Sequence, residues 1–135
     1  HGRNFVPAVI NKLLDNQTVE IYENSIGTPT YAGALADYII ELAATQSPRK
    51  MVHYCSDVVL DRAELADMIV HPLSLLTHNT YTMKVTASTS LSNSTHTIRP
   101  DYSALQSTQN TFGKEQAVTT LQQHILHIIQ SILNK

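Results

Sequence analysis

The last segment of the chain is the feature that most limits what this sequence can fold into. From Lys114 to Leu133 apolar residues recur at helical spacing, and Gly113 directly precedes the segment. The apolar positions are Val118, Leu121, Ile125, Ile128, Ile129 and Ile132. A helix with an apolar stripe of this length has to bury it against other elements. We therefore expect a terminal helix that docks on a core built by the preceding residues.

The first third of the chain predicts a helix, a strand and a second helix. Phe5 to Leu14 has helical periodicity with Pro7 near its start, and Asp15-Asn16 should end it. Thr18 to Tyr22 alternates β-forming and polar residues and predicts a short strand. Tyr31 to Ala44 predicts the second helix, with Thr30 as its N-cap.

The middle of the chain repeats this order. Met51 to Cys55 predicts a strand, and Asp61 is a suitable N-cap for a third helix that Pro72 should disturb. This helix is expected to run through Arg62, Leu65, Met68 and Ile69. Residues 77–97 are rich in Ser, Thr and Asn, and within them only Tyr81 to Val85 alternates like a strand.

Alternation of strands and helices over 135 residues indicates one small α/β domain, residues 1–135, with a few short strands and about four helices. The formal charge of −2 and the lack of a long Lys/Arg run favour neither nucleic acid nor a membrane as partner. A single cysteine, Cys55, fits a reducing cytoplasm. The chain begins at His1 and not at Met, which indicates part of a longer protein or a residue left by a tag.

The usual sequence signatures of enzymatic chemistry are missing. There is no Gly-x-Ser-x-Gly elbow and no glycine-rich phosphate loop, and none of the six tyrosines has a lysine four positions later. Only His124 and His127 share helical spacing among the seven histidines, with no carboxylate beside them as a third zinc ligand. We expect no catalytic, cofactor-binding or metal-binding residue in this chain, and Cys55 should pack rather than attack.

Three polar clusters at predicted loops carry the functional signal. They are Gly2-Arg3-Asn4-Phe5-Val6, Gly27-Thr28-Pro29-Thr30-Tyr31, and Arg99-Pro100-Asp101-Tyr102-Ser103-Ala104-Leu105. Each cluster taken singly is also explained by turn and cap chemistry. In this order and spacing, followed by Phe112-Gly113, they resemble the C-terminal half of dTDP-4-dehydrorhamnose reductases, members of the extended short-chain dehydrogenase/reductase superfamily.

The resemblance spans nearly the whole chain and is loosest in the middle. Val52-His53-Tyr54 matches the family's strand only roughly, and residues 57–61 replace a helix start that contains an aromatic residue. Glu23-Asn24 stands where the family has Asp-Gln, in the loop that faces the sugar. A specific sugar contact at that position is therefore not implied.

The resemblance implies a two-part enzyme. A Rossmann domain upstream of His1 would hold NAD(P)H and the catalytic residues, and this chain would bind the dTDP-sugar that is reduced to dTDP-L-rhamnose. No cofactor is expected on this chain alone. The substrate-binding candidates are Arg99, Ser103, Asn4, Gly27, Thr28 and Thr30.

Arg99 is the first of these candidates, because its planar guanidinium offers a fork of donors to a diphosphate and Pro100 restricts its backbone. Ser103 offers a hydroxyl to the ligand or to its own turn. Asn4 sits at a helix start and acts as an N-cap or as an amide donor to the ligand. Thr28 and Thr30 are caps or sugar contacts, and Gly27 permits a turn or a close approach of the ligand.

Two further hypotheses remain open from the sequence. One is a non-enzymatic regulatory or interaction module with a reductase-like fold, as in the methionine adenosyltransferase β subunit. The other is a related sugar-nucleotide epimerase or reductase. In either case apolar faces that normally pack on the Rossmann domain would be exposed in the isolated chain, and we expect such faces to favour self-association.

Overall fold

A computed structural model gives the fold, and the structure describes residues 4–22, 25–45, 51–86, 100–107 and 114–134. The helices are α1 (Phe5–Leu14), α2 (Ala32–Ala44), α3 (Arg62–Thr77) and α4 (Lys114–Leu133). The strands are β1 (Val19–Tyr22) and β2 (Met83–Thr86). This is the α/β arrangement of few short strands and four helices that the sequence predicts.

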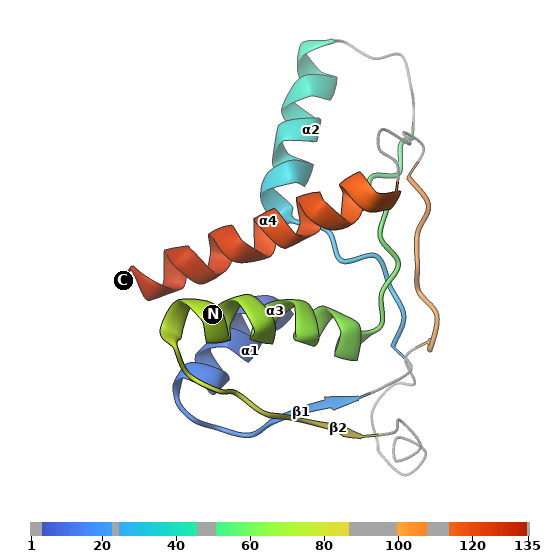
Figure 1. Ribbon diagram of the computed structural model, residues 1–135. Helices are drawn as coiled ribbons and strands as arrows, with labels where there is room; N and C mark the ends of the chain where they lie inside the picture. Colours follow the sequence, from blue (N-terminus) through green and yellow to red (C-terminus); the bar gives the residue numbers. More distant parts are fainter. Residues whose placement is uncertain (1–3, 23–24, 46–50, 87–99, 108–113, 135) are drawn as a thin grey trace.

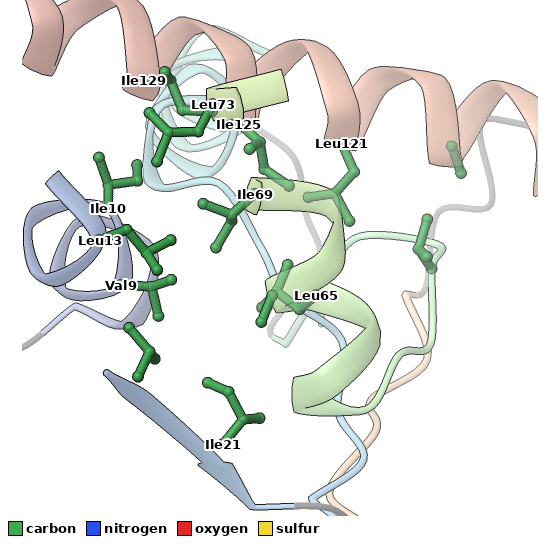
Figure 2. Close-up of a cluster of buried hydrophobic side chains, with 14 residues drawn as sticks. Val9, Ile10, Leu13, Ile21, Leu65, Ile69, Leu73, Leu121, Ile125 and Ile129 are labelled. Atoms are coloured by element: carbon green, nitrogen blue, oxygen red, sulfur yellow. The ribbon is translucent and has the colours of Figure 1, made fainter. Parts of the chain in front are cut away.

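The core lies between α1, α3, α4 and the inner face of β1. Figure 2 shows Ile69 of α3 between Ile10 and Leu13 of α1 on one side and Ile125 of α4 on the other. The largest fully buried side chains are Ile10, Leu13, Ile69, Leu73, Ile125 and Ile129. The predicted apolar stripe of α4 is confirmed, since Leu121, Ile125 and Ile129 are buried on one face.

The sheet is small and parallel. β1 pairs with β2 in the register Val19 with Met83 through Tyr22 with Thr86, so the strands join segments that are far apart in the chain. Parallel strands cannot be joined by a tight hairpin, and here the connection runs through α2 and α3. The predicted strand at 81–85 is present but displaced to Met83–Thr86.

The predicted strand at Met51–Cys55 is wrong, because these residues belong to neither strand of the described sheet. Side-chain hydrogen bonds to the 100–107 segment hold them instead. The Ser107 hydroxyl donates to the His53 carbonyl at 3.3 Å, and the Cys55 thiol donates to the Leu105 carbonyl at 3.3 Å.

α3 begins as predicted, and the expected disturbance at Pro72 does not end it. The Asp61 carboxylate accepts from the Glu64 N–H at 2.8 Å, and the Glu64 carboxylate accepts from the Asp61 N–H at 2.8 Å, which is a capping box. Pro72 lies inside the helix, which continues to Thr77. The fully buried Leu73 explains why the helix continues, because ending it at Pro72 would remove this side chain from the core.

α2 stands apart from this core. It projects away from α4 and α3 in Figure 1, and none of its residues is buried. The stack of Tyr38 on Tyr54, with ring centroids 4.6 Å apart, connects α2 to the 51–57 segment. None of the helices in the described ranges is long and apolar enough to cross a membrane.

Candidate functional site

The candidate site is a cavity of about 580 Å³ where α1, α2 and α3 all begin. Its wall is formed by residues 4–7, 25–32 and 60–62, by Ser103 and Leu105, and by the face of α4 that carries Leu121, His124, Ile125 and Ile128. The volume lies within the range of small-molecule sites. The wall combines polar side chains with apolar ones, which suits a ligand that has a charged part and a less polar ring.

The loop 25–31 is fixed on both of its sides by backbone hydrogen bonds. Gly27 and Leu60 exchange bonds of 2.9 and 3.0 Å between their N–H and carbonyl groups. Ile26 donates to the Asp101 carbonyl at 2.8 Å and accepts from the Ser103 N–H at 2.9 Å. The second and third polar clusters of the sequence are therefore neighbours in space.

The structure brings together five of the six predicted substrate-binding residues around this cavity. They are Asn4, Gly27, Thr28, Thr30 and Ser103. Arg99 lies outside the described residues, as do Gly2, Arg3, Glu23, Asn24, Phe112 and Gly113. The position of the five residues makes a common ligand geometrically feasible, and their role in binding stays a prediction.

Hydroxyl groups in the wall already connect the loops to one another. The Ser103 hydroxyl donates to the Ile26 carbonyl at 3.1 Å, which is a bond across loops and not within its own turn. The Thr28 hydroxyl accepts from the Leu105 N–H at 3.3 Å. A hydroxyl has one donor and two acceptor positions, so each can still take part in one further contact with a ligand.

Thr30 is not the N-cap of α2, because Tyr31 occupies that position. The Thr30 hydroxyl donates to the Thr28 carbonyl at 3.0 Å and accepts from the Ser56 N–H at 3.2 Å. This hydroxyl thus stabilises the loop and its contact with the 51–57 segment. A Ser/Thr side chain can bond its own turn as readily as a helix end, which is why the sequence did not distinguish the two.

The helices that begin at the cavity differ in how they are capped. Asn4 and Tyr31 are the N-caps of α1 and α2, and neither side chain makes a capping hydrogen bond. Asp61 caps α3 with its carboxylate. The N–H groups at a helix start carry partial positive charge and favour anions, so α1 and α2 both offer donors that their own N-cap side chains do not use.

Gly27 has an ordinary backbone and does not serve a left-handed turn, since no described glycine has a positive φ. A Cβ at this position would lie 3.5 Å from the Ser103 Oγ. Gly33, in the first turn of α2, is more constrained, because a Cβ there would overlap the ring of Tyr31. Gly33 therefore allows the Tyr31 ring to lie over the start of its own helix.

Arg62, Tyr31 and His124 line the cavity but were not among the substrate-binding candidates, although Tyr31 ends the second polar cluster and His124 was considered as a zinc ligand. Arg62 was interpreted only as a helical position, yet it lines the cavity with its guanidinium 5.4 Å from the centre of the Phe5 ring. Tyr31 and His124 stack with ring centroids 4.4 Å apart and also line it. Arg62 directly follows the predicted N-cap Asp61, and this place at a helix start is the sequence feature that could have indicated a position near the cavity.

Burial lowers the pKa of His124 below its ordinary value of 6.5, and the neighbouring His127 adds to the shift. The imidazole is therefore largely neutral near pH 7. Tyr54 has a pKa raised above its ordinary value of 10.0, first by burial and then by Asp37 and Asp57. Both rings thus meet their neighbours as uncharged groups at neutral pH.

The described part of the chain holds no cluster of three His, Cys, Asp or Glu side chains that could bind a metal ion. Cys55 is buried, and its thiol donates to a carbonyl, as expected of a packing residue. Among the described residues we find no glycine-rich turn between a strand and a helix that would hold a dinucleotide.

Comparison with known proteins gives the chain a family. The family model for the RmlD substrate binding domain matches residues 1–134. No curated protein sequence matches the chain.

The structure of a dTDP-4-dehydrorhamnose reductase from Bacillus anthracis str. Ames, in complex with NADP, shares the fold with a TM-score of 0.68 at 17% identity. The match covers 94% of this chain and 43% of that one, so this chain spans less than half of the neighbour's length. On the family match over residues 1–134, the chain belongs to the RmlD substrate binding domain family.

Proposed function

We propose that this chain is the sugar-nucleotide-binding part of an NAD(P)H-dependent dTDP-4-dehydrorhamnose reductase. The observation that carries the proposal is the cavity at the starts of α1, α2 and α3, which collects Asn4, Gly27, Thr28, Thr30 and Ser103 from three separate segments. Family membership and the name of the structural neighbour support the reaction class. The reaction reduces the 4-keto group of dTDP-6-deoxy-L-lyxo-4-hexulose to give dTDP-L-rhamnose.

The proposed task of this chain is to bind and orient the substrate. The N–H groups at the starts of α1 and α2 suit phosphate oxygens, while the Asn4 amide and the Thr and Ser hydroxyls suit sugar hydroxyls. The apolar face of α4 suits the less polar surface of a ring. Fixing the substrate in one orientation lowers the entropic part of the barrier, and these contacts would supply that contribution.

The residues of this chain do not fit NADP(H), since the chain has no glycine-rich phosphate loop and no Tyr-x-x-x-Lys pair. NAD(P)H supplies a hydride when bound. We assign it and the proton-transfer groups to a Rossmann domain that this chain does not contain. The single buried cysteine supports a cytoplasmic enzyme.

The test is a titration of the 135-residue chain, followed by NMR or calorimetry, with dTDP-L-rhamnose, UDP-glucose, GDP-mannose and NADPH. We expect dTDP-L-rhamnose to bind most tightly and NADPH not to bind. Asn4→Ala should weaken binding without changing stability, because the Asn4 side chain makes no capping bond. Asn11→Ala is the matched control, since Asn11 lies exposed on the same helix and does not line the cavity.

Equal binding of all three sugar nucleotides would remove the dTDP assignment and favour a related epimerase or reductase. Binding of NADPH to this chain would contradict the division of labour that we propose. An absence of binding by any nucleotide, in a chain that is folded by circular dichroism, would favour the regulatory module.

A further inference from the structure

Arg62 is held in a fixed place at the cavity by a neighbour on another helix. It is the first residue of α3, and its guanidinium carbon lies 5.4 Å from the centre of the Phe5 ring of α1. The side chain is half-buried. A guanidinium over an aromatic face is stabilised by cation–π attraction, and its in-plane N–H donors remain available at the edges.

The charge of Arg62 is not neutralised by an ion pair within the described ranges. The one ion pair found there joins Lys84 and Glu20 on the sheet. The nearest acidic groups in sequence, Asp61 and Glu64, are directed to each other's backbone N–H groups in the capping box. Of the described residues in the cavity wall, Arg62 is also the only lysine or arginine.

An anion at this point would meet several favourable groups at once. The starts of α1 and α2, which their N-cap side chains do not cap, line the same cavity as Arg62. Partial positive charge from helix starts and a full charge from a guanidinium add in a partly buried site. The carboxylate of Asp61 also lines the wall and repels an anion. A bound anion therefore needs the paired hydrogen-bond donors of the Arg62 guanidinium, because nearby positive charge alone is partly offset by Asp61.

We propose that Arg62 binds the diphosphate of the sugar nucleotide, as a binding residue that is separate from Arg99. The inference rests on the proposed function and extends it, since it names the group that recognises the charged part of the ligand. The Phe5 ring sets the position of the guanidinium, and the fork binds two phosphate oxygens side by side. A lysine at this position keeps the charge and loses the fork.

The test compares Arg62→Met and Arg62→Lys with the unchanged chain. Methionine keeps an unbranched apolar stem that can pack on Phe5. Lys84→Met is the matched control, because it removes one positive charge from the exposed sheet, away from the cavity. The probes are dTDP, UDP, GDP, inorganic pyrophosphate and thymidine, titrated by calorimetry at fixed ionic strength, and urea unfolding reports stability.

We expect Arg62→Met to weaken dTDP and pyrophosphate binding about 10- to 100-fold, the loss typical of a hydrogen-bonded charge contact. Thymidine binding and the urea midpoint should not change, Arg62→Lys should lie in between, and Lys84→Met should bind like the unchanged chain. Equal weakening of thymidine and dTDP would show a merely structural role and overturn the inference.

The two proposals can fail separately. If dTDP binds more tightly than UDP and GDP and Arg62→Met binds it normally, the inference on Arg62 is overturned and the proposed function stands. If Arg62→Met weakens all three diphosphates and the unchanged chain shows no preference for dTDP, Arg62 stands and the dTDP assignment is overturned. No binding of pyrophosphate or any diphosphate to the unchanged chain overturns both.

Discussion

The ring of Tyr31 stacks on the imidazole of His124, with ring centroids 4.4 Å apart and an angle of 25° between the planes. Tyr31 is the N-cap of α2, and His124 lies on α4. The stack therefore connects the projecting helix to the core at the wall of the cavity. Two predictions concern this pair directly.

Gly33→Ala should separate the Tyr31 ring from His124, because the added Cβ would overlap that ring. Alanine also favours a helix by about 1 kcal/mol, so stability alone does not report the change. The measurement is the chemical shift of the His124 ring protons, which should lose the ring current of Tyr31. Gly27→Ala is the control, since its Cβ meets the Ser103 Oγ at an ordinary 3.5 Å. An unshifted His124 resonance in Gly33→Ala would contradict the prediction.

Stability should fall as the pH drops through and below 6.5. The folded state lowers the pKa of His124, chiefly by burial, so the unfolded chain binds the proton more tightly. The stability that neutral His124 contributes is fully present above 6.5, its pKa in the unfolded chain. This stability is lost as the pH falls toward the lower pKa of His124 in the folded state. Urea unfolding between pH 8 and 5 measures it, and His124→Gln should flatten the curve. His127→Gln, on the exposed face, should flatten it less.

Asp61→Ala should reduce stability by about 1 kcal/mol, because it removes the side-chain acceptor of the Glu64 N–H and the capping box. Asn4→Ala at the start of α1 should cost much less, since Asn4 makes no side-chain cap bond. Chemical denaturation of both variants gives the comparison. Equal losses would mean that the capping box does not stabilise α3.

Ile69→Ala should destabilise the fold by roughly 2–5 kcal/mol, because Ile69 is fully buried between α1 and α4. Leu75→Ala on the same helix is the control, with a side chain that is 65% exposed and an expected change within about 0.5 kcal/mol. Urea midpoints of the two variants measure the difference. A small effect of Ile69→Ala would place the centre of the core elsewhere.

The isolated chain should self-associate through α2, where Ile39 and Ile40 are 55% and 66% exposed. Light scattering at rising concentration should show dimers or larger species. Ile39→Glu with Ile40→Glu should restore the monomer without loss of stability, because no residue of α2 is buried. Gln122→Glu with Gln123→Glu, which adds the same charge at exposed polar positions of α4, is the control and should leave the association unchanged. A monomeric chain at high concentration would contradict this prediction.

Periodicity predicted the helices well, because α1, α3 and α4 bury one face each and the apolar residues have to recur there. Helical spacing also predicted α2, although none of its side chains is buried. The error at Met51–Cys55 has a physical cause, because a local sequence pattern does not report whether a neighbouring segment supplies the backbone hydrogen bonds of a strand.

The site was predictable as a set of segments and not as a set of contacts. Two of the polar clusters named from the sequence do meet, as the bond from the Leu105 N–H to the Thr28 hydroxyl demonstrates. The spacing of the clusters could not identify His124, whose apolar neighbours on α4 make it resemble a core position. Nor could it assign Arg62, because a charged residue in the first turn of a helix is usually solvated.

The parallel pairing of β1 with β2 affects the order in which the chain can fold. Val19 and Met83 are paired, and the segment between them contains α2 and α3. The ends of this long segment have to come together before the two strands can pair. Loop closure costs entropy before the pairing stabilises anything, so such contacts form late. The helices can dock on one another first, because α1, α3 and α4 contact one another in the core and the inner face of β1 completes it. Val19 and Ile21 would then report the final step, and the backbone next to the cavity would be ordered only when the chain has almost finished folding.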